Sequence, residues 1–196
     1  MISPKSCATS SVRFHAWFRL MAETYREVPL GDDILDTALR RARSLPVFEN
    51  SHRKLQANIV GCIGEVVFER FLERHGIAFE DRRESTRHDY AFPGGMTLDL
   101  KTKDRTVRPK IDFDNSVPLY NHEHQRPDLY YFVSLLRDRS DDDEDIARFK
   151  MAFLLGGIDI GTLDRDGTKW EAGQTDPRNG TKFWSACLIV SMAKLF

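Results

Sequence analysis

Residues 96–103 alternate between apolar and polar side chains, which is the pattern of a β-strand with one buried face. Leu98 and Leu100 fall on the apolar side of this strand, while Asp99 and Lys101 fall on the other. An ordinary solvated sheet face would carry neutral polar residues such as Thr, Ser and Gln. The carboxylate and ammonium groups at alternate positions therefore mark this strand as a place to look for ionic chemistry.

Two stretches upstream of this strand have the periodicity of amphipathic helices. The first helix is predicted to begin at Asp32, with Asp32 or Asp33 as its N-terminal cap and Pro46 beyond its end. The second is longer, covers about residues 51–75, and is predicted to stop at Gly76.

The remainder of the chain reads mainly as strands. The run at residues 129–136, "LYYFVSLL", is apolar throughout and is typical of a central strand covered on both faces. The other predicted strands lie at residues 77–80, 89–92, 96–103, 149–156 and 183–192, with a polar stretch up to about residue 127 and a Gly, Asp and Asn-rich stretch at 156–181. We therefore expect an α/β or α+β fold with a central mixed β-sheet flanked by helices.

The 196 residues, 41% of them hydrophobic, are enough for a single globular domain, which we place at residues 23–196 after a loosely ordered N-terminal arm at 1–22. No apolar run approaches the roughly 20 residues that span a bilayer, and the first twenty residues lack the apolar block of a secretory signal. The three cysteines have neither disulfide-framework nor metal-site spacing, and Cys62 and Cys187 fit core positions. A cytoplasmic protein without membrane contact is expected.

The net charge of −1 conceals two regions of opposite sign. Residues 82–110 hold eight Lys and Arg against four acidic residues, and residues 138–145, "DRSDDDED", hold six acidic residues against one Arg. The acidic run is typical of an exposed loop, so the basic segment remains available to a polyanion.

A hairpin would bring two aspartates face to face. If Pro93–Gly95 form a three-residue loop, with Gly95 in the left-handed position, then Asp89 lies directly opposite Asp99 and the apolar faces of both strands agree. Like charges across a ladder are destabilising, so a counter-charge is expected. Lys101 can reach back along the same face, and Mg²⁺, which prefers oxygen ligands, would neutralise both carboxylates better. A solvated surface ion cluster is the simpler alternative.

The longer predicted helix contains an acidic residue within its apolar sequence, "NIVGCIGEVVFERFL". Glu65 is preceded by Gly61 and Gly64, each of which costs a helix interior roughly 0.5–1 kcal/mol relative to Ala. The glycines indicate close approach by another backbone or by a ligand, or else an ordinary helix-packing groove with Glu65 at its edge.

In these residues the chain resembles the PD-(D/E)XK, or restriction-endonuclease-like, nuclease superfamily. The core of that family begins with a helix carrying Glu and continues into a β-hairpin bearing Asp and then (Asp/Glu)-x-Lys. The matching residues are Glu65 in "GCIGEVVF", Asp89 in "HDYAF", and Asp99 with Lys101 in "LDLK". His88 stands where the motif has its proline. The following "RTVRPK" segment, and a Gln before the apolar strand, are similar to phage-type members.

The resemblance implies a Mg²⁺-dependent DNA endonuclease, in which Mn²⁺ can replace Mg²⁺, in a bacterial or phage-infected cell. It assigns the following roles: Glu65, Asp89, Asp99 and the Leu100 carbonyl to the metal, Lys101 to the attacking water, Gln125 to the water or phosphate, and Lys103, Arg105, Arg108 and Lys110 to backbone phosphates. A solvated basic loop is the alternative for the last four. A homodimeric recombination or Holliday-junction nuclease and a nuclease that degrades host DNA both fit.

Two other interpretations remain. A non-catalytic module that binds nucleic acid or protein could retain the fold without the reaction. The sequence "NHEHQ" suggests zinc through His122 and His124, but no further ligand is evident and both are interpreted as loop residues.

Overall fold

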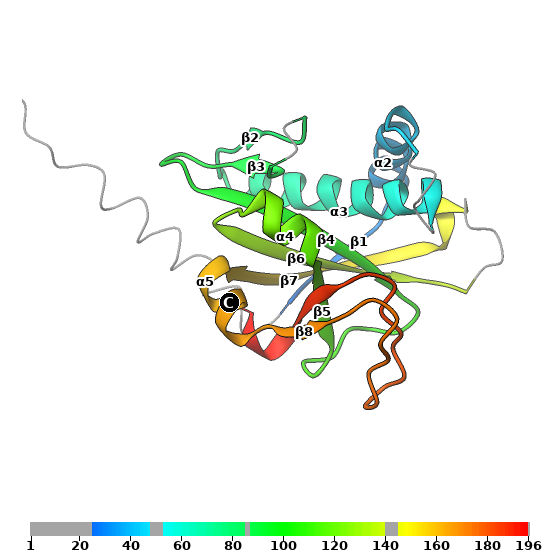
Figure 1. Ribbon diagram of the computed structural model, residues 1–196. Coiled ribbons are helices and arrows are strands. Elements are labelled where there is room, and N and C mark those ends of the chain that lie inside the picture. Colours follow the sequence, from blue (N-terminus) through cyan, green and yellow to red (C-terminus); the bar gives the residue numbers. More distant parts are fainter. Residues whose placement is uncertain (1–24, 48–52, 85–86, 140–144, 196) are drawn as a thin grey trace, which may run out of the picture.

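The computed structural model describes residues 25–47, 53–84, 87–139 and 145–195, and the predicted N-terminal arm and most of the acidic run lie outside this part. Within it the chain forms a mixed α+β fold of two sheets and several helices (Figure 1). The larger sheet has the strand order β1-β7-β6-β4-β3-β2. Its strands are β1 (Arg26–Pro29), β2 (Glu80–Asp81), β3 (Tyr90–Ala91), β4 (Thr97–Arg105), β6 (Leu129–Arg137) and β7 (Phe149–Asp159).

The larger sheet is mixed, as the sequence predicts, because β4 and β6 run parallel while the other neighbouring strands run antiparallel. Strand β6 lies between β7 and β4, and seven of its nine residues are buried. Tyr131 and Val133 face one hydrophobic core, whereas Tyr130 and Phe132 face a second core on the other side of the sheet. The prediction of a central strand covered on both faces is therefore confirmed.

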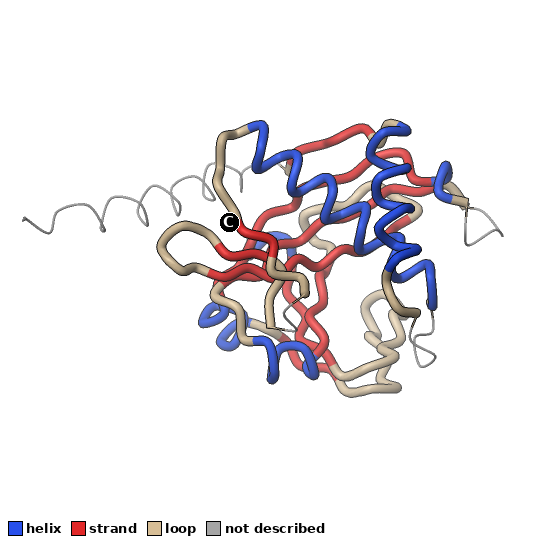
Figure 2. Tube along the Cα trace, turned by 90° about the horizontal axis from the view of Figure 1, so that it is seen from above, coloured by secondary structure: helices blue, strands red, loops and turns tan. Residues whose placement is uncertain are grey.

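Helices α2 (Asp32–Ser44) and α3 (Lys54–Arg74) cover one face of this sheet, and Figure 2 shows them from above. Both predicted helices are confirmed, but the predicted cap of α2 is wrong. The N-cap residue is Gly31, whose carbonyl accepts the N–H groups of Ile34 and Leu35, and no side chain caps the helix. The Asp33 carboxylate instead binds Arg70 of α3, because the packing of the two helices brings this guanidinium within reach.

The predicted stop of α3 is confirmed in detail. Gly76 adopts a positive φ of 66°, its N–H donates to the Glu73 carbonyl, and the N–H of Ile77 donates to the Leu72 carbonyl over 2.9 Å. These two bonds satisfy carbonyls that would otherwise lack partners at the end of the helix. They also turn the chain toward β2 and the hairpin.

The opposite face of the larger sheet packs against a second, three-stranded sheet in the order β5-β9-β8, which the sequence did not predict. This sheet consists of β5 (Asp114–Pro118), β9 (Cys187–Ser191) and β8 (Thr168–Trp170), and the short helices α4 (Leu119–Gln125) and α5 (Ile160–Asp166) accompany it. Only β9 was predicted, at residues 183–192. The others lie in stretches expected to be irregular, because such short segments carry too few apolar residues to show a period.

Short 3-10 turns, η1 (Ile146–Arg148) and η2 (Met192–Lys194), precede β7 and follow β9. None of the helices in the described residues combines the length and the apolar character needed to cross a membrane.

Helix α3 approaches β4 closely at Gly64. A Cβ atom added at Gly64 would lie 2.0 Å from Oγ1 and 2.9 Å from Cβ of Thr102, whereas one added at Gly61 would meet nothing within 4 Å. The glycine at position 64 is therefore required by the packing of helix on sheet, and the glycine at position 61 is not.

We predict that Gly64→Ala lowers the free energy of unfolding by about 1–3 kcal/mol, because the methyl group forces the helix away from Thr102. The matched control Gly61→Ala, in the same helix, should be neutral or raise stability by up to about 1 kcal/mol. Urea unfolding of the two variants and the parent protein measures both effects. Equal changes in the two variants would contradict the role given to the close approach.

Candidate functional site

The β3–β4 hairpin has the loop that the sequence predicts. The N–H of Phe92 donates to the Met96 carbonyl over 2.8 Å, and Gly95, with a φ of 86°, donates to the Phe92 carbonyl over 3.0 Å. Tyr90 pairs with Leu98, so the register is that of a three-residue loop. The apolar side chains of the hairpin accordingly face the core beneath α3.

This register brings Asp89 and Asp99 together. The N–H of Asp89 continues the ladder by donating to the Leu98 carbonyl, and its Oδ2 accepts the N–H of Leu100 over 2.7 Å. The Asp89 carboxyl therefore crosses to β4 beside Asp99, which is only 2% exposed. Burial, followed by the charge of Asp99, raises the pKa of Asp89 to about 7. Two acidic groups thus share one poorly solvated position.

Lys101 supplies the positive charge of this site. Its Nζ lies 2.5 Å from Oδ2 of Asp99 and 6.0 Å from the ring centre of Tyr130. Burial raises the pKa of Asp99, while the charge and hydrogen bond of Lys101 lower it. The Asp-x-Lys spacing therefore does what the alternation predicts, since both side chains lie on the same face and in contact. We call Asp89 and Asp99 the acidic pair, and Lys101 is the lysine of this pair.

Glu65 does not join the acidic pair. Helix α3 packs on the Leu98 and Leu100 side of β4, and alternation places Asp99 on the other side. The Glu65 carboxylate binds the Arg83 guanidinium, and burial raises the pKa of Glu65 while Arg83 opposes the rise. Its charge still contributes to the raised pKa of Asp89.

Arg83 connects three carboxylates next to the hairpin. It binds Asp81 and Glu65, and its Nη2 lies 3.1 Å from Oε1 of Glu69. Glu69 also accepts the Tyr90 hydroxyl. In the described part of the chain, no three His, Cys, Asp or Glu side chains lie together in a group able to hold a metal ion. The predicted set of three acidic ligands is therefore represented by two residues together and a third held by an arginine.

Leu100 and Gln125, to which the resemblance also assigns roles at the site, lie on neighbouring elements. Leu100 is buried and pairs with Tyr131 in the parallel ladder between β4 and β6. Gln125 is the last residue of α4 and is half-buried. The chain then leads into β6, where Tyr130 is the register partner of Asp99. Gln125 thus ends its helix shortly before β6, whose first residues pair with the part of β4 that carries Asp99.

The four predicted phosphate-binding residues fall into two classes. Arg105 donates to the Asp114 carbonyl over 2.7 Å and lies over the Phe113 ring, and Arg108 pairs with Glu27. These two side chains make internal contacts that hold the loop after β4 to the rest of the fold. Lys103 and Lys110 are exposed residues, but burial of the Lys103 ammonium group still lowers its pKa.

A buried histidine network next to the site was not foreseen. His122 lies in α4, not in a loop, and is 4% exposed. Its Nδ1 lies 3.1 Å from the Tyr130 hydroxyl, and its Nε2 lies 2.5 Å from Asp164 of α5, which also binds Arg126. No sequence signal could have indicated this network, because its members come from three separate elements. Its effect is to fix α4 on the ring against which Lys101 lies.

No protein-family model matches this chain, and a search of curated proteins returns no match. The function must therefore be argued from the geometry.

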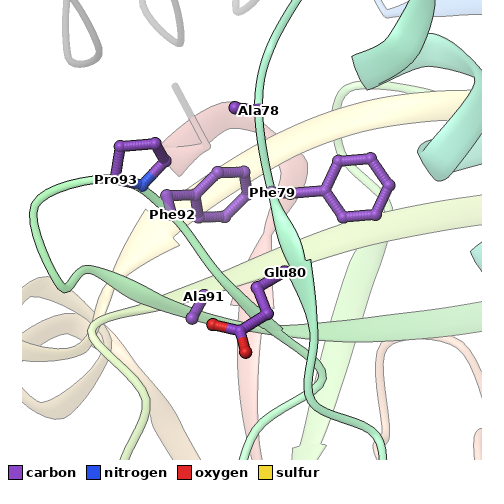
Figure 3. A pocket seen from close by; sticks show the side chains of 6 residues that line it. All are labelled: Ala78, Phe79, Glu80, Ala91, Phe92 and Pro93. Atoms are coloured by element: carbon purple, nitrogen blue, oxygen red, sulfur yellow. The ribbon is translucent and has the colours of Figure 1, made fainter.

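A pocket of about 270 Å³ lies beside the hairpin (Figure 3). Phe79 and Phe92 belong to its lining, and Glu80 points its carboxylate toward Ala91. Its lining, which is completed by Ala78 and Pro93, includes neither acid of the acidic pair. The candidate site is therefore on the sheet surface opposite α3, apart from this pocket.

The raised pKa of Asp89 predicts a pH-dependent stability. The folded protein retains a proton on Asp89 between about pH 4 and pH 7, where the unfolded chain has lost it, so this group's contribution to stability falls as pH rises through that range. Asp89→Asn removes the contribution while retaining an acceptor for Leu100. Urea unfolding without metal should show that the free energy of unfolding of the variant, relative to that of the parent protein, increases from about pH 5 to about pH 8.

The matched control is Asp36→Asn on the exposed face of α2. The difference in the free energy of unfolding between this variant and the parent protein should stay constant across the same pH range. If D89N and D36N change with pH in the same way, the burial of Asp89 does not govern the effect.

Proposed function

We propose that the protein is a Mg²⁺-dependent DNA endonuclease that hydrolyses phosphodiester bonds, in the manner of the PD-(D/E)XK superfamily that its sequence resembles. The observation that carries the proposal is the contact between the acidic pair and its lysine on a two-stranded hairpin. Helix α3, with Glu65, precedes this hairpin in the chain, with only the short strand β2 between them. The order of Asp89, Asp99 and Lys101 along the chain and their proximity on the hairpin support the proposal.

The residues present fit a divalent cation. Burial raises the pKa of both carboxyl groups, and the charge of Asp99 raises that of Asp89 further, so a doubly charged ion would stabilise the ionised pair better than one ammonium group. The two carboxylates and the Leu100 carbonyl would hold the ion. When bound, Mg²⁺ would supply charge neutralisation at the phosphate and activation of water.

The other steps belong to this chain's own residues. Asp99 holds the Lys101 ammonium in place, and Lys101 would donate a hydrogen bond to the attacking water and orient it toward phosphorus. Gln125 would contact the phosphate or this water from the end of α4. Lys103 and Lys110 would bind backbone phosphates without reading sequence. The internal contacts of Arg105 and Arg108 favour a structural role for these two.

The rival proposal is a non-catalytic module that binds nucleic acid or protein. The observation that favours it is the position of Glu65, whose carboxylate is bound by Arg83 and lies apart from the acidic pair. A calorimetric titration distinguishes the two proposals. Uptake of Mg²⁺ or Mn²⁺ that disappears in Asp99→Asn supports the nuclease, and the lack of any uptake supports the module.

Asp99→Asn and Lys101→Ala should each lower Mg²⁺-dependent cleavage of plasmid and oligonucleotide DNA by at least about 100-fold. The first removes a carboxylate that would hold the metal ion, and the second removes the ammonium group that would orient the attacking water. Lys150→Ala, an exposed residue on β7, is the matched control and should retain full activity. EDTA should abolish cleavage by the parent protein. Unchanged activity in both site variants would refute the assignment.

Four-way junctions and duplexes of the same sequence should be compared in this assay. Preferential cleavage of the junction by a homodimer would favour a phage recombination nuclease over one that degrades host DNA.

Arg83→Gln should strengthen Mn²⁺ binding by roughly threefold to tenfold, because the guanidinium neutralises Glu65, whose negative charge acts on Asp89, and because its own positive charge repels a cation at the acidic pair. Isothermal calorimetry measures the change. Arg82→Gln is the matched control, since Arg82 pairs with Glu80 and leaves Glu65 untouched. Binding by R83Q that is no tighter than binding by R82Q would contradict this electrostatic effect.

A further inference from the structure

We infer that Tyr120 and Trp184 form a stacking site for unpaired nucleotide bases beside the acidic pair, so that the substrate is DNA with a single-stranded or branched segment. This inference rests on the proposed function and specifies its substrate class. Its starting point is exposure: Tyr120 is 72% and Trp184 69% exposed. Large aromatic rings held this far in water are costly, and they are typical of binding surfaces.

The two rings come from segments that the fold holds together. The N–H of Leu119 donates to the Ala186 carbonyl over 2.9 Å, which joins the start of α4 to the start of β9. Tyr120 follows Leu119 directly, and Trp184 precedes Ala186 by two residues. This hydrogen bond extends the β5–β9 ladder and holds together, at one end of the second sheet, the two backbone segments that carry the aromatic residues.

Cationic or polar groups accompany both rings. The Lys182 Nζ lies 5.0 Å from the centre of the Trp184 ring, and the His124 ring stacks on Tyr120 with centres 4.6 Å apart. A base needs only one open face of a ring, and an ammonium group beside it attracts the phosphate of the same nucleotide. Exposed aromatic rings with adjacent cations are the usual platform for single-stranded nucleic acid.

The platform and the acidic pair lie on the same side of the larger sheet. Cys187 follows Ala186, and the charge of Lys103 is one of the influences on the pKa of the Cys187 thiol, which burial raises. Lys103 stands two residues beyond Lys101 on the same strand and face. Figure 1 shows β5 and β8 on the side of the sheet opposite α2 and α3.

The chemistry favours an unpaired base over an intact duplex. The flat faces of bases are covered by their neighbours in a duplex, and only unpaired or splayed bases can stack on protein rings. Lys103 and Lys182 would attract the backbone of either substrate, so they add affinity without this preference. The aromatic rings therefore supply the selectivity for unpaired segments.

Binding is measured in EDTA, which prevents cleavage, by titrating the protein with oligothymidylate and with a blunt duplex while following tryptophan fluorescence. Oligothymidylate should quench the emission, and Trp184→Phe should lose most of this quenching while Trp17 and Trp170 remain. Trp184→Ala and Tyr120→Ala should each weaken single-strand binding by roughly tenfold and leave duplex binding unchanged. Trp184→Phe should bind nearly as tightly as the parent protein.

Leu45→Ala, an exposed apolar residue after α2 on the opposite face, is the matched control and should bind normally. Equal affinity of W184A, Y120A and L45A for oligothymidylate would overturn the inference, as would equal losses for single strand and duplex. Asp99→Asn separates the two proposals. If D99N cleaves normally but W184A binds poorly, the nuclease site is refuted and the stacking site stands; loss of cleavage in D99N with normal binding by W184A gives the converse.

Discussion

The alternation of side chains along β4 governs both the fold and the candidate site. Its Leu98, Leu100 and Thr102 side carries α3, which approaches so closely that position 64 has room only for glycine. Its Asp99 and Lys101 side faces away from that helix. A shift of one residue in the pairing of the hairpin would bury the charged side chains beneath α3 and expose the leucines. The packing of the helix thus holds the ionic residues in place.

Two cationic side chains pair with the carboxylates at this hairpin, one on each side of the sheet. Lys101 contacts Asp99 on one side, and Arg83 binds Glu65, Glu69 and Asp81 on the side of α3. Buried carboxylates without such partners would raise their pKa values or destabilise the fold. Five carboxylates therefore lie near one hairpin, three of them around Arg83 and two, Asp89 and Asp99, on the side of Lys101.

The second sheet gives this surface its shape. Strand β9 and helix α4 meet through one backbone hydrogen bond, and His122 ties α4 to Tyr130 under Lys101. In our proposal the acidic pair alone would act on a phosphodiester group without a preference for any DNA structure. The second sheet places exposed aromatic rings on the same side, and in our proposal this arrangement joins the reaction to a preference for unpaired bases.

Much of the fold could be predicted because its signals are local. Apolar periodicity identified α2, α3, β4, β6 and β7, the three-residue loop set the register of the hairpin, and Gly76 marked the end of α3. The meeting of Asp89, Asp99 and Lys101 followed from that register alone. Each of these features depends on residues close together in the chain, so the sequence by itself determined them.

The partners of several charged residues were decided only by the tertiary structure. Arg83 reaches Glu65 across 18 positions of the chain, Arg108 reaches Glu27 across 81, and His122 reaches Asp164 across 42. The covering of the second face by β5, β8 and β9 depends on equally distant pairings. No local period encodes such contacts, because they form only when packing of the core brings remote segments together.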